Sequence, residues 1–393
     1  MRLSYPGSGQ RLRMALAILL LFALAAGAIW LWQTLSAPRT PAADSDLQAV
    51  LGGGEVTAAG YARVTEARPF VFPADHAAHP DYRSEWWYFT GNVATPDGRP
   101  FGFQLTFFRF ALAPDMPERA SAWATRQAWM AHFAITDVHG KSHRAEERFE
   151  RGALDLAGAS ATPVRIWLAD WSARGSAAAL FPLRLHARSD GMALELELHS
   201  DKPLVLQGDQ GYSRKSAQPG NASHYYSYTR LRATGTLAIA GQTWPVEGSA
   251  WLDREWSTSS LGPEQVGWDW FALQLDDQRE VMLYRLRQRD GTKSPYSAGV
   301  IVGPQGTVQH LGADDFQLTP QRWWRSPESK VRYPITWQIR VPSADLDLTV
   351  AARLADQEMR LTYAYWEGAV TVAGDTTTGV GYLEMTGYGQ TEP

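Results

Sequence analysis

The 393-residue chain contains no cysteine. This absence excludes disulfide bonds, thiolate metal ligands, a cysteine nucleophile and the attachment cysteine of a bacterial lipoprotein. Charge of one sign is not in excess either, because 37 basic and 41 acidic side chains give a formal net charge of -4. The chain therefore has no electrostatic footprint for nucleic acid. It also lacks a phosphate loop, a dinucleotide fingerprint and the Gly-x-Ser-x-Gly elbow of serine hydrolases.

A long apolar run extends from Met14 to Trp32, after a segment with arginines at positions 2, 11 and 13. At helical rise it is about 28 Å long, close to the roughly 30 Å hydrocarbon core of a bilayer. The basic end favours the cytoplasm. We therefore predict a cytoplasmic stub and membrane anchor at residues 1–36, in the inner membrane, with the body of the protein in the periplasm. A cleaved signal peptide, which would give a secreted or periplasmic protein, is the alternative.

The rest of the chain has the pattern of short antiparallel strands. Residues 37–68 are rich in Ala, Pro, Gly and Asp and predict a flexible linker. Beyond them, apolar and polar residues alternate, as in residues 101–107 and 192–198, and turn pairs such as Asp97-Gly98 separate the runs. No convincing helical period follows the anchor. We predict an all-β body built from antiparallel barrels or sandwiches.

A weak internal repeat indicates two β domains of one type. Residues 88–93 resemble residues 270–275, since in both segments a pair of aromatic residues precedes an amide and an aliphatic residue. Each segment is followed by a turn and a second long strand. This pattern predicts an N-terminal domain at residues 69–250 and a C-terminal domain at residues 251–393.

Aromatic residues are abundant, with 17 Trp, 15 Tyr and 14 Phe, and they surround acids at three places. These places are Glu85 before residues 86–89, Asp253 within residues 251–256, and residues 267–271. Aromatic side chains line pockets for bulky apolar molecules or sugars, and apolar surroundings favour the protonated form of an acid. We expect Glu85 and Asp253 to lie near each other. The predicted ligand-binding residues include Trp86, Trp87, Tyr88, Trp251, Trp256, Trp268 and Trp270.

Two other kinds of site are weighed from the same residues. His76, His79 and Glu85 are of types that ligate zinc or iron, but Pro80 breaks any helix that would align the histidines. We predict no metal and no cofactor. Asp253 and Glu255 would share one face of a strand, as the paired acids of some β-sandwich glycosidases do. A glycan-active or glycan-binding β protein is therefore one alternative.

A family resemblance rests on longer motifs. Residues 79–88, His-Pro-Asp-Tyr-Arg-Ser-Glu-Trp-Trp-Tyr, with Gly91-Asn92 resemble the N-terminal signature of the carotenoid 1,2-hydratase (hydroxyneurosporene synthase) family. Within that family, the chain resembles the AttH-like branch of exported proteins more closely than the hydratases. Segments at residues 132–137, 225–228 and 251–256 fit in the same order, so the resemblance spans residues 70–390. It implies two lipocalin-like β domains, an exported location and an ABC transporter as a frequent genetic neighbour.

The resemblance also implies a reaction and a set of residues. The hydratases add water to an isolated C=C of a polyene without a cofactor. Asp253 occupies the position of their proposed acid, and His224 and Tyr226 lie where helper residues are expected. Glu85 completes the predicted catalytic set, and His132, in the matching segment, joins the predicted ligand-binding residues. The chain departs from the hydratases by having Trp251 where tyrosine is expected and Tyr226 where tryptophan is expected.

Three functions follow as predictions. The first is a membrane-anchored periplasmic lipocalin-like protein that binds a lipophilic molecule, isoprenoid or lipid-like, in association with an ABC transporter. The second is a hydratase in which a protonated acid attacks a double bond, aromatic faces stabilise the cation, and a base such as His224 helps water to add. The third is the glycan protein. An apolar tunnel would favour the first two, and an open groove with two facing carboxylates would favour the third.

Overall fold

The computed structural model describes residues 58–115, 120–176, 179–259 and 261–390. The predicted stub and anchor, and most of the predicted linker, lie outside these residues. Within the described part of the chain no helix has the length and apolar character that a bilayer crossing requires. Its helical elements are three short 3-10 helices, η2 (Ala74–His76), η3 (Pro342–Ala344) and η4 (Tyr388–Gln390).

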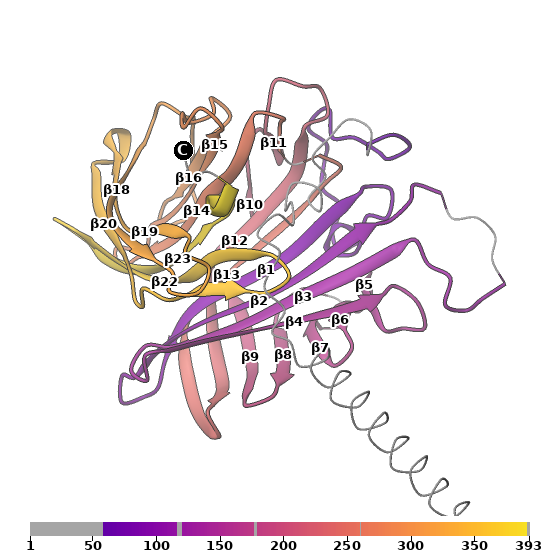
Figure 1. The fold of residues 1–393 in the computed structure, drawn as a ribbon, viewed down its shortest axis with the longest axis horizontal. Helices are drawn as coiled ribbons and strands as arrows, with labels where there is room; N and C mark the ends of the chain where they lie inside the picture. The colour runs from indigo at the N-terminus through magenta and orange to yellow at the C-terminus, as the bar shows by residue number, and fades with distance from the viewer. Residues whose placement is uncertain (1–57, 116–119, 177–178, 260, 391–393) are drawn as a thin grey trace, which may run out of the picture. The chain divides into compact units, whose positions relative to one another are not determined.

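Two antiparallel sheets form the fold (Figure 1). In the described residues the first sheet has thirteen strands, in the order β4-β3-β2-β1-β13-β12-β9-β8-β7-β6-β5, with β10 and β11 paired to β12. Its strands are β1 (Ser84–Ala94), β2 (Pro100–Ala111), β3 (Gln127–Asp137), β4 (Ser142–Arg151), β5 (Ala157–Ala161), β6 (Val164–Leu168), β7 (Trp171–Arg174), β8 (Leu183–Ser189), β9 (Met192–Ser200), β10 (Val205–Leu206), β11 (Tyr212–Arg214), β12 (Ala222–Ile239) and β13 (Gln242–Ser257).

The second sheet has ten strands in the described residues, in the order β17-β16-β15-β14-β23-β22-β20-β19-β18, with β21 paired to β22. Its strands are β14 (Gln265–Leu275), β15 (Glu280–Gln288), β16 (Ala298–Val302), β17 (Val308–Leu311), β18 (Gln317–Arg325), β19 (Arg332–Val341), β20 (Leu346–Ala352), β21 (Glu358–Arg360), β22 (Ala364–Gly374) and β23 (Thr378–Met385). The all-β prediction and the prediction of two lipocalin-like domains are confirmed.

The repeated segments occupy equivalent strands. Residues 88–93 lie in β1, which pairs with the next strand, β2, and with the last strand of its sheet, β13. Residues 270–275 lie in β14, which pairs in the same way with β15 and with β23. The predicted domain division between residues 250 and 251 falls inside β13, which stays in the first sheet along its whole length. The chain passes from one sheet to the other between Ser257 and Gln265.

Strand alternation divides the apolar side chains among three buried clusters. One face of the first sheet forms a core within that domain, which contains Trp87 and Phe89. The second sheet has its own core, with Phe271 and Trp337. A third cluster contains residues of both sheets, among them Tyr88, Tyr225, Trp270 and Tyr382. Because successive side chains of a strand point to opposite faces, β1 and β14 each supply one internal core and the contact between the domains.

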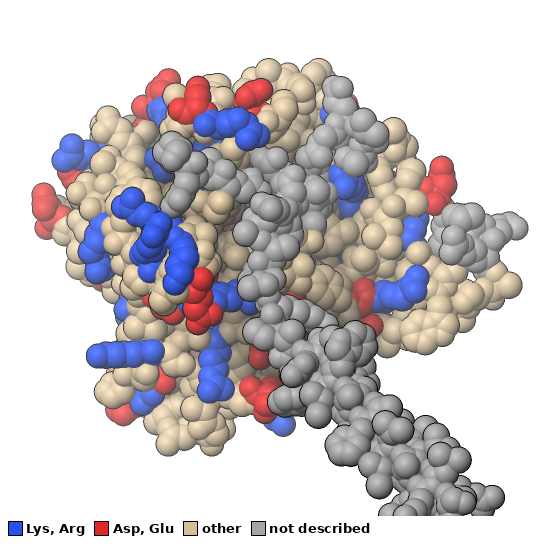
Figure 2. Space-filling view, viewed as in Figure 1, with Lys and Arg blue, Asp and Glu red and all other residues tan. Residues whose placement is uncertain are grey.

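Polar contacts also join the two domains. The amide Nδ2 of Asn92 in β1 donates to the carbonyl oxygen of Gly381 in β23, at 2.9 Å. Glu280 of β15 is buried and accepts from Lys202 at 2.8 Å and from Arg230. On the face shown in Figure 2, acidic and basic side chains are interspersed, in keeping with the nearly balanced composition. The domains are therefore fixed to each other by buried apolar and charged groups, and the site lies at this contact.

Candidate functional site

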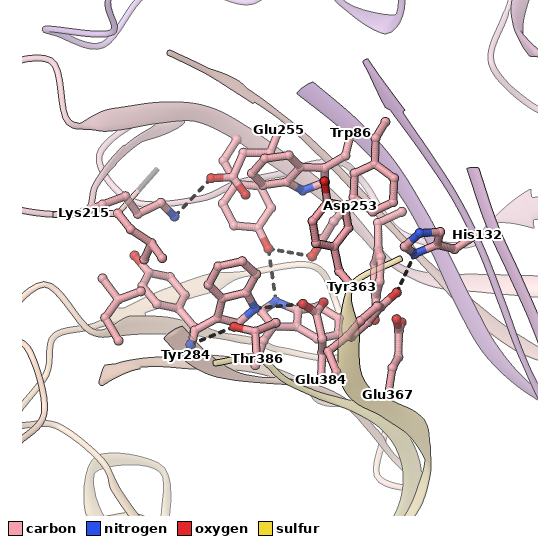
Figure 3. Close-up of a pocket in the computed structure, with 18 of the residues that line it drawn as sticks. Trp86, His132, Lys215, Asp253, Glu255, Tyr284, Tyr363, Glu367, Glu384 and Thr386 are labelled. Atoms are coloured by element: carbon pink, nitrogen blue, oxygen red, sulfur yellow. Dashed lines mark hydrogen bonds and ion pairs between the residues drawn. The ribbon is translucent and has the colours of Figure 1, made fainter. Parts of the chain in front are cut away.

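A cavity of about 110 Å³ lies between the two sheets. Its wall is mostly apolar. Aromatic residues from both domains supply much of this wall: Trp86, Tyr88, Phe108, Phe110, Tyr225, Trp268, Trp270, Tyr284, Tyr363 and Tyr365. A smaller set of ionisable side chains points into the same space (Figure 3): His132, Lys215, Asp253, Glu255, Glu367 and Glu384. Such a combination of apolar wall and few polar groups is typical of sites for small lipophilic molecules.

Asp253 reaches the cavity from the middle of β13. In the ladders it faces Tyr88 of β1 and Ser227 of β12. Its Oδ1 accepts from Trp251 Nε1 at 2.7 Å and from the Ser227 hydroxyl at 2.5 Å. Its Oδ2 lies 2.6 Å from the Tyr225 hydroxyl. Oδ1 accepts two hydrogen bonds and Oδ2 accepts one, from Tyr225, so Oδ2 is the oxygen with a lone pair left to carry a proton.

The surroundings of Asp253 favour its acid form. Burial raises the pKa of this carboxyl from 3.8 to about 7; hydrogen bonds from Ser227, Tyr225 and Trp251 oppose the shift, and neighbouring Glu255 adds to it. The side chain is 3 % exposed. Arg254 does not compensate its charge, because alternation sends that guanidinium to the opposite face, where it donates to Glu85. Asp253 is therefore a buried acid that can hold its proton near neutral pH.

Glu255, two residues further along β13, is differently placed. Its carboxylate lies 3.1 Å from Lys215 Nζ and also accepts from the Ser223 hydroxyl. Burial lowers the pKa of Lys215, but the negative charge of Glu255 and the Tyr284 ring outweigh it, so the net shift is upward. Glu255 and Lys215 therefore form a buried ion pair in the cavity wall (Figure 3). This pairing leaves Glu255 poorly suited to be the second catalytic carboxylate of a glycosidase.

A second pair of acids comes from the C-terminal domain. Glu367 of β22 and Glu384 of β23 stand directly opposite each other in the ladder, and Glu384 accepts from Trp268 Nε1 at 2.9 Å. Burial raises the pKa of both carboxyls, and the charge of Glu384 adds to the shift at Glu367. Two carboxylates this close in apolar surroundings cannot both be ionised without a large cost. The pair therefore retains at least one proton at neutral pH.

His132 of β3 lies at the first-domain side of the cavity (Figure 3). Its Nδ1 is 2.8 Å from the Tyr365 hydroxyl of β22, and its Nε2 is 3.3 Å from Glu147 Oε2 of β4. Burial lowers the pKa of His132, although Glu147 opposes the shift. The ring is therefore neutral at pH 7, and it contacts a residue of each domain.

The structure places Glu85 on the other face of the first sheet. It accepts from Arg109 and Arg254, and the backbone N–H of His79 lies 2.9 Å from its Oε1. Burial alone would raise the pKa of Glu85, but the two guanidinium groups and His79 hold it well below its usual value. Glu85 and Asp253 lie on neighbouring strands of one sheet, β1 and β13, and point to opposite faces. Glu85 is an ionised core carboxylate and does not reach the cavity.

His224 and Tyr226 share that opposite face. The Tyr226 hydroxyl lies 2.6 Å from His76 Nδ1, and the His224 ring packs near Trp256. Burial, with the positive charge of Arg68, lowers the pKa of His224 to about 4. Neither residue lines the cavity. The side chains of β12 that do face Asp253 are Tyr225 and Ser227, one position away from each predicted helper.

The predicted ligand-binding residues divide in the same way. Five line the cavity: Trp86, Tyr88, Trp268, Trp270 and His132. Trp251 lies behind Asp253 and donates to it. Trp87 and Trp256 face away, and Arg254 stacks against both rings. Six side chains at the site were not predicted from the sequence: Tyr225, Ser227, Lys215, Tyr365, Glu367 and Glu384. Residues 363–367, Tyr-Ala-Tyr-Trp-Glu, repeat the pattern of an acid among aromatic residues and could have pointed to Glu367.

Comparisons with known proteins add a family to this geometry. A family model of AttH-like proteins matches residues 63–388. A crystal structure of an AttH protein from Nitrosomonas europaea is 34 % identical in sequence, with a TM-score of 0.76. That similarity covers 83 % of this chain and 99 % of the other.

Two further relatives are more distant. The crystal structure of kievitone hydratase from Nectria haematococca has a TM-score of 0.62 at 13 % identity, covering 83 % of this chain and 95 % of that one. At this identity the likeness shows the fold alone. Dehydratase asqC of Emericella nidulans is 20 % identical over 218 residues, which are 52 % of this chain and 60 % of the relative. The chain thus spans less than two thirds of that curated relative's length.

Proposed function

The chain belongs to the AttH-like family, and on that premise we propose that it is a hydro-lyase acting on a lipophilic, unsaturated molecule in the cavity between its domains. The observation that carries the proposal is Asp253, a buried acid with a pKa of about 7 inside an aromatic wall. The dehydratase among its relatives supports the reaction class by its name, and kievitone hydratase shares the fold. Binding of a lipophile, the function placed first by the sequence, is part of this proposal.

The chemistry uses the chain's own side chains. The O–H bond at Asp253 Oδ2 breaks and its proton forms a C–H bond with one alkene carbon, while the π electrons of the C=C supply the pair. The more substituted carbon is left as a cation, which the faces of nearby rings such as Trp270 stabilise. A water molecule adds to that carbon and loses a proton, which gives an alcohol. Dehydration is the same sequence in reverse.

The pH dependence of the reaction tests this proposal. Only the acid form of Asp253 can protonate the alkene, so the rate should be highest below pH 7 and fall about tenfold per pH unit above it. We would assay geraniol, farnesol and lycopene, each with trisubstituted double bonds, between pH 5 and 9, and follow alcohol formation by mass spectrometry. Binding would be followed separately by quenching of tryptophan fluorescence.

The outcomes separate an enzyme from a binding protein. Alcohol formation with a loss of rate near pH 7 supports the hydro-lyase. Fluorescence quenching by all three molecules without alcohol from any of them contradicts it and supports a lipophile-binding protein. A rate that rises through pH 7 would indicate a catalytic base in place of the acid and would also contradict the proposal.

We also propose that the protein is attached to the inner membrane by residues 14–32, with the domains in the periplasm and an ABC transporter as partner. The support for attachment is the apolar run, and the support for the transporter is the family resemblance. An intact-mass measurement of the native protein, purified from membranes, is expected to include residues 1–36. A mature chain that begins near Ala37 would show signal cleavage and would overturn the anchor.

A further inference from the structure

A row of three side chains connects the cavity with solvent across the contact between the domains. The Tyr365 hydroxyl, from the second domain, lies 2.8 Å from His132 Nδ1, and His132 Nε2 lies 3.3 Å from Glu147 Oε2. Tyr365 lines the cavity and His132 is 2 % exposed. The Glu147 side chain is 14 % exposed and thus reaches the surface. A proton that moves from Tyr365 to His132 can therefore pass on to solvent at Glu147.

The hydrogen bonds fix the direction in which this row can move a proton. Glu147 also accepts from Thr362, whose hydroxyl lies 2.6 Å from its Oε1. An ionised carboxylate can only accept, so Nε2 of His132 must carry the ring proton. Nδ1 is then the acceptor and the Tyr365 hydroxyl is the donor. Burial and the neighbouring Glu367 raise the pKa of Tyr365, so its hydroxyl can release its proton only as it takes another. Glu367, whose pKa is also raised, favours its neutral form and leaves His132 as the acceptor. This is the arrangement in which a hydroxyl can give up its proton to a neutral imidazole.

The proposed reaction needs a proton acceptor, and the other ionisable groups of the cavity are poorly suited to that role. Asp253 is the proton donor, and Glu367 and Glu384 have raised pKa values and favour their neutral forms. Lys215 is a cation paired with Glu255. His224, the base predicted from the sequence, lies on the other face of the sheet. His132 is a neutral imidazole in the cavity wall, and its Nδ1 lies 2.8 Å from the hydroxyl of Tyr365, which also lines the cavity.

We infer that Tyr365, backed by His132 and Glu147, removes the proton from the water that adds to the substrate cation. This inference rests on the proposed function. In this step an O–H bond of water breaks and a new O–H bond forms on Tyr365, while the original Tyr365 proton moves to His132 Nδ1. The imidazolium is stabilised by Glu147 and loses its proton to solvent, and Asp253 regains one. Tyr365 is the catalytic group, and His132 and Glu147 are positioning residues.

Deuterium exchange separates this step from the Asp253 step. In D₂O, reversible protonation by Asp253 places deuterium on the alkene, whether or not water adds to the cation. Tyr365→Phe and His132→Gln should lower alcohol formation from farnesol at least tenfold while retaining deuterium incorporation. Glu147→Gln should do the same to a smaller extent. Glu197→Gln is the matched control, because it breaks a similar carboxylate–histidine pair, with His199 at 3.0 Å, on the surface of the same domain.

The results have distinct meanings. Wild-type protein that neither exchanges deuterium nor forms alcohol contradicts the proposed function itself, and this inference with it. Wild-type activity with full alcohol formation in Tyr365→Phe and His132→Gln overturns the inference alone. A variant that loses both readouts together with its circular dichroism spectrum would show a structural role for the row, which also counts against it. Nitrogen NMR of ¹⁵N-histidine-labelled protein provides a check without substrate, since His132 should carry its proton on Nε2; a proton on Nδ1 would exclude the transfer.

Discussion

Asp253→Asn is expected to lower alcohol formation by at least ~100-fold, because general acid catalysis contributes about 10² to 10⁴ in rate. The fold should be retained. The asparagine oxygen can take the place of Oδ1 and accept from Trp251 and Ser227, while its NH₂ group can donate to the Tyr225 hydroxyl. Ligand affinity, measured by tryptophan quenching, should stay within a few-fold of wild type.

The same substitution should make the protein more stable at neutral pH. The folded pKa of Asp253, about 7, lies above the 3.8 of an exposed aspartate, so the folded state holds its proton more tightly. The free energy of unfolding therefore falls as pH rises from about 4 to 7, by about 4 kcal/mol from this residue. Asparagine does not titrate, so the variant should lack this loss. The difference in the free energy of unfolding between the variant and wild type should grow between pH 4 and pH 7 and then level off.

Urea unfolding at several pH values measures this gain. Asp201→Asn is the control, because Asp201 is a half-exposed aspartate of the same domain, paired with Arg232 on the surface. It should leave alcohol formation unchanged, because Asp201 does not line the cavity. Equal alcohol formation by wild type and Asp253→Asn would exclude Asp253 as the acid. Equal stability at pH 7 would show that its carboxyl is ionised in the folded protein.

Glu85→Gln is expected to destabilise the protein by about 3–5 kcal/mol, because removal of one partner leaves buried charges uncompensated. Glu85 is fully buried between Arg109 and Arg254, and both guanidinium groups are nearly inaccessible. Since the folded pKa of Glu85 lies far below its unfolded value, its contribution is fully present above about pH 4.3 and is lost as pH falls. The difference between variant and wild type should therefore shrink on acidification.

The comparison variant for this experiment is Glu195→Gln, which removes an exposed carboxylate near His186 on the surface of the first domain. Urea unfolding at pH 7 should show a change of less than about 0.5 kcal/mol for Glu195→Gln. If Glu85→Gln were equally mild, the buried ion pairs would contribute little and Glu85 would need another explanation. The reaction rate per folded molecule should be unchanged, because Glu85 does not reach the cavity.

Strand alternation made much of the fold and part of the site predictable. The turn pairs and alternating runs indicated antiparallel β structure, and the repeat located β1 and β14 in equivalent positions. Alternation within β13 also placed Asp253 and Glu255 on one face and Arg254 on the other, as the structure has them. These features depend on neighbours within one strand, for which the period of two is sufficient.

Features that depend on pairing between distant strands were not predictable in this way. His224 and Tyr226 lie one position from Tyr225 and Ser227, and nothing within residues 222–239 tells which of the two faces meets the cavity. Glu367 and Glu384 come from the C-terminal strands and approach Asp253 only because the two sheets pack together. The raised pKa of Asp253 has the same origin, since it results from burial of the carboxyl between the two sheets.

One face of β13 lines the cavity through Asp253, and the other holds the buried ion pair of Arg254 with Glu85. This arrangement limits how the sequence of the strand can change. Substitutions on the cavity face need not disturb the Glu85–Arg254 ion pair, because that pair lies on the opposite face. Insertions and deletions are a different matter. One residue gained or lost between Trp251 and Asp253, with the preceding part of β13 kept in register, would turn Arg254 toward the cavity and Asp253 toward the core. Length variation among proteins of this fold should therefore be confined to the turns, and β13 should vary by replacement alone.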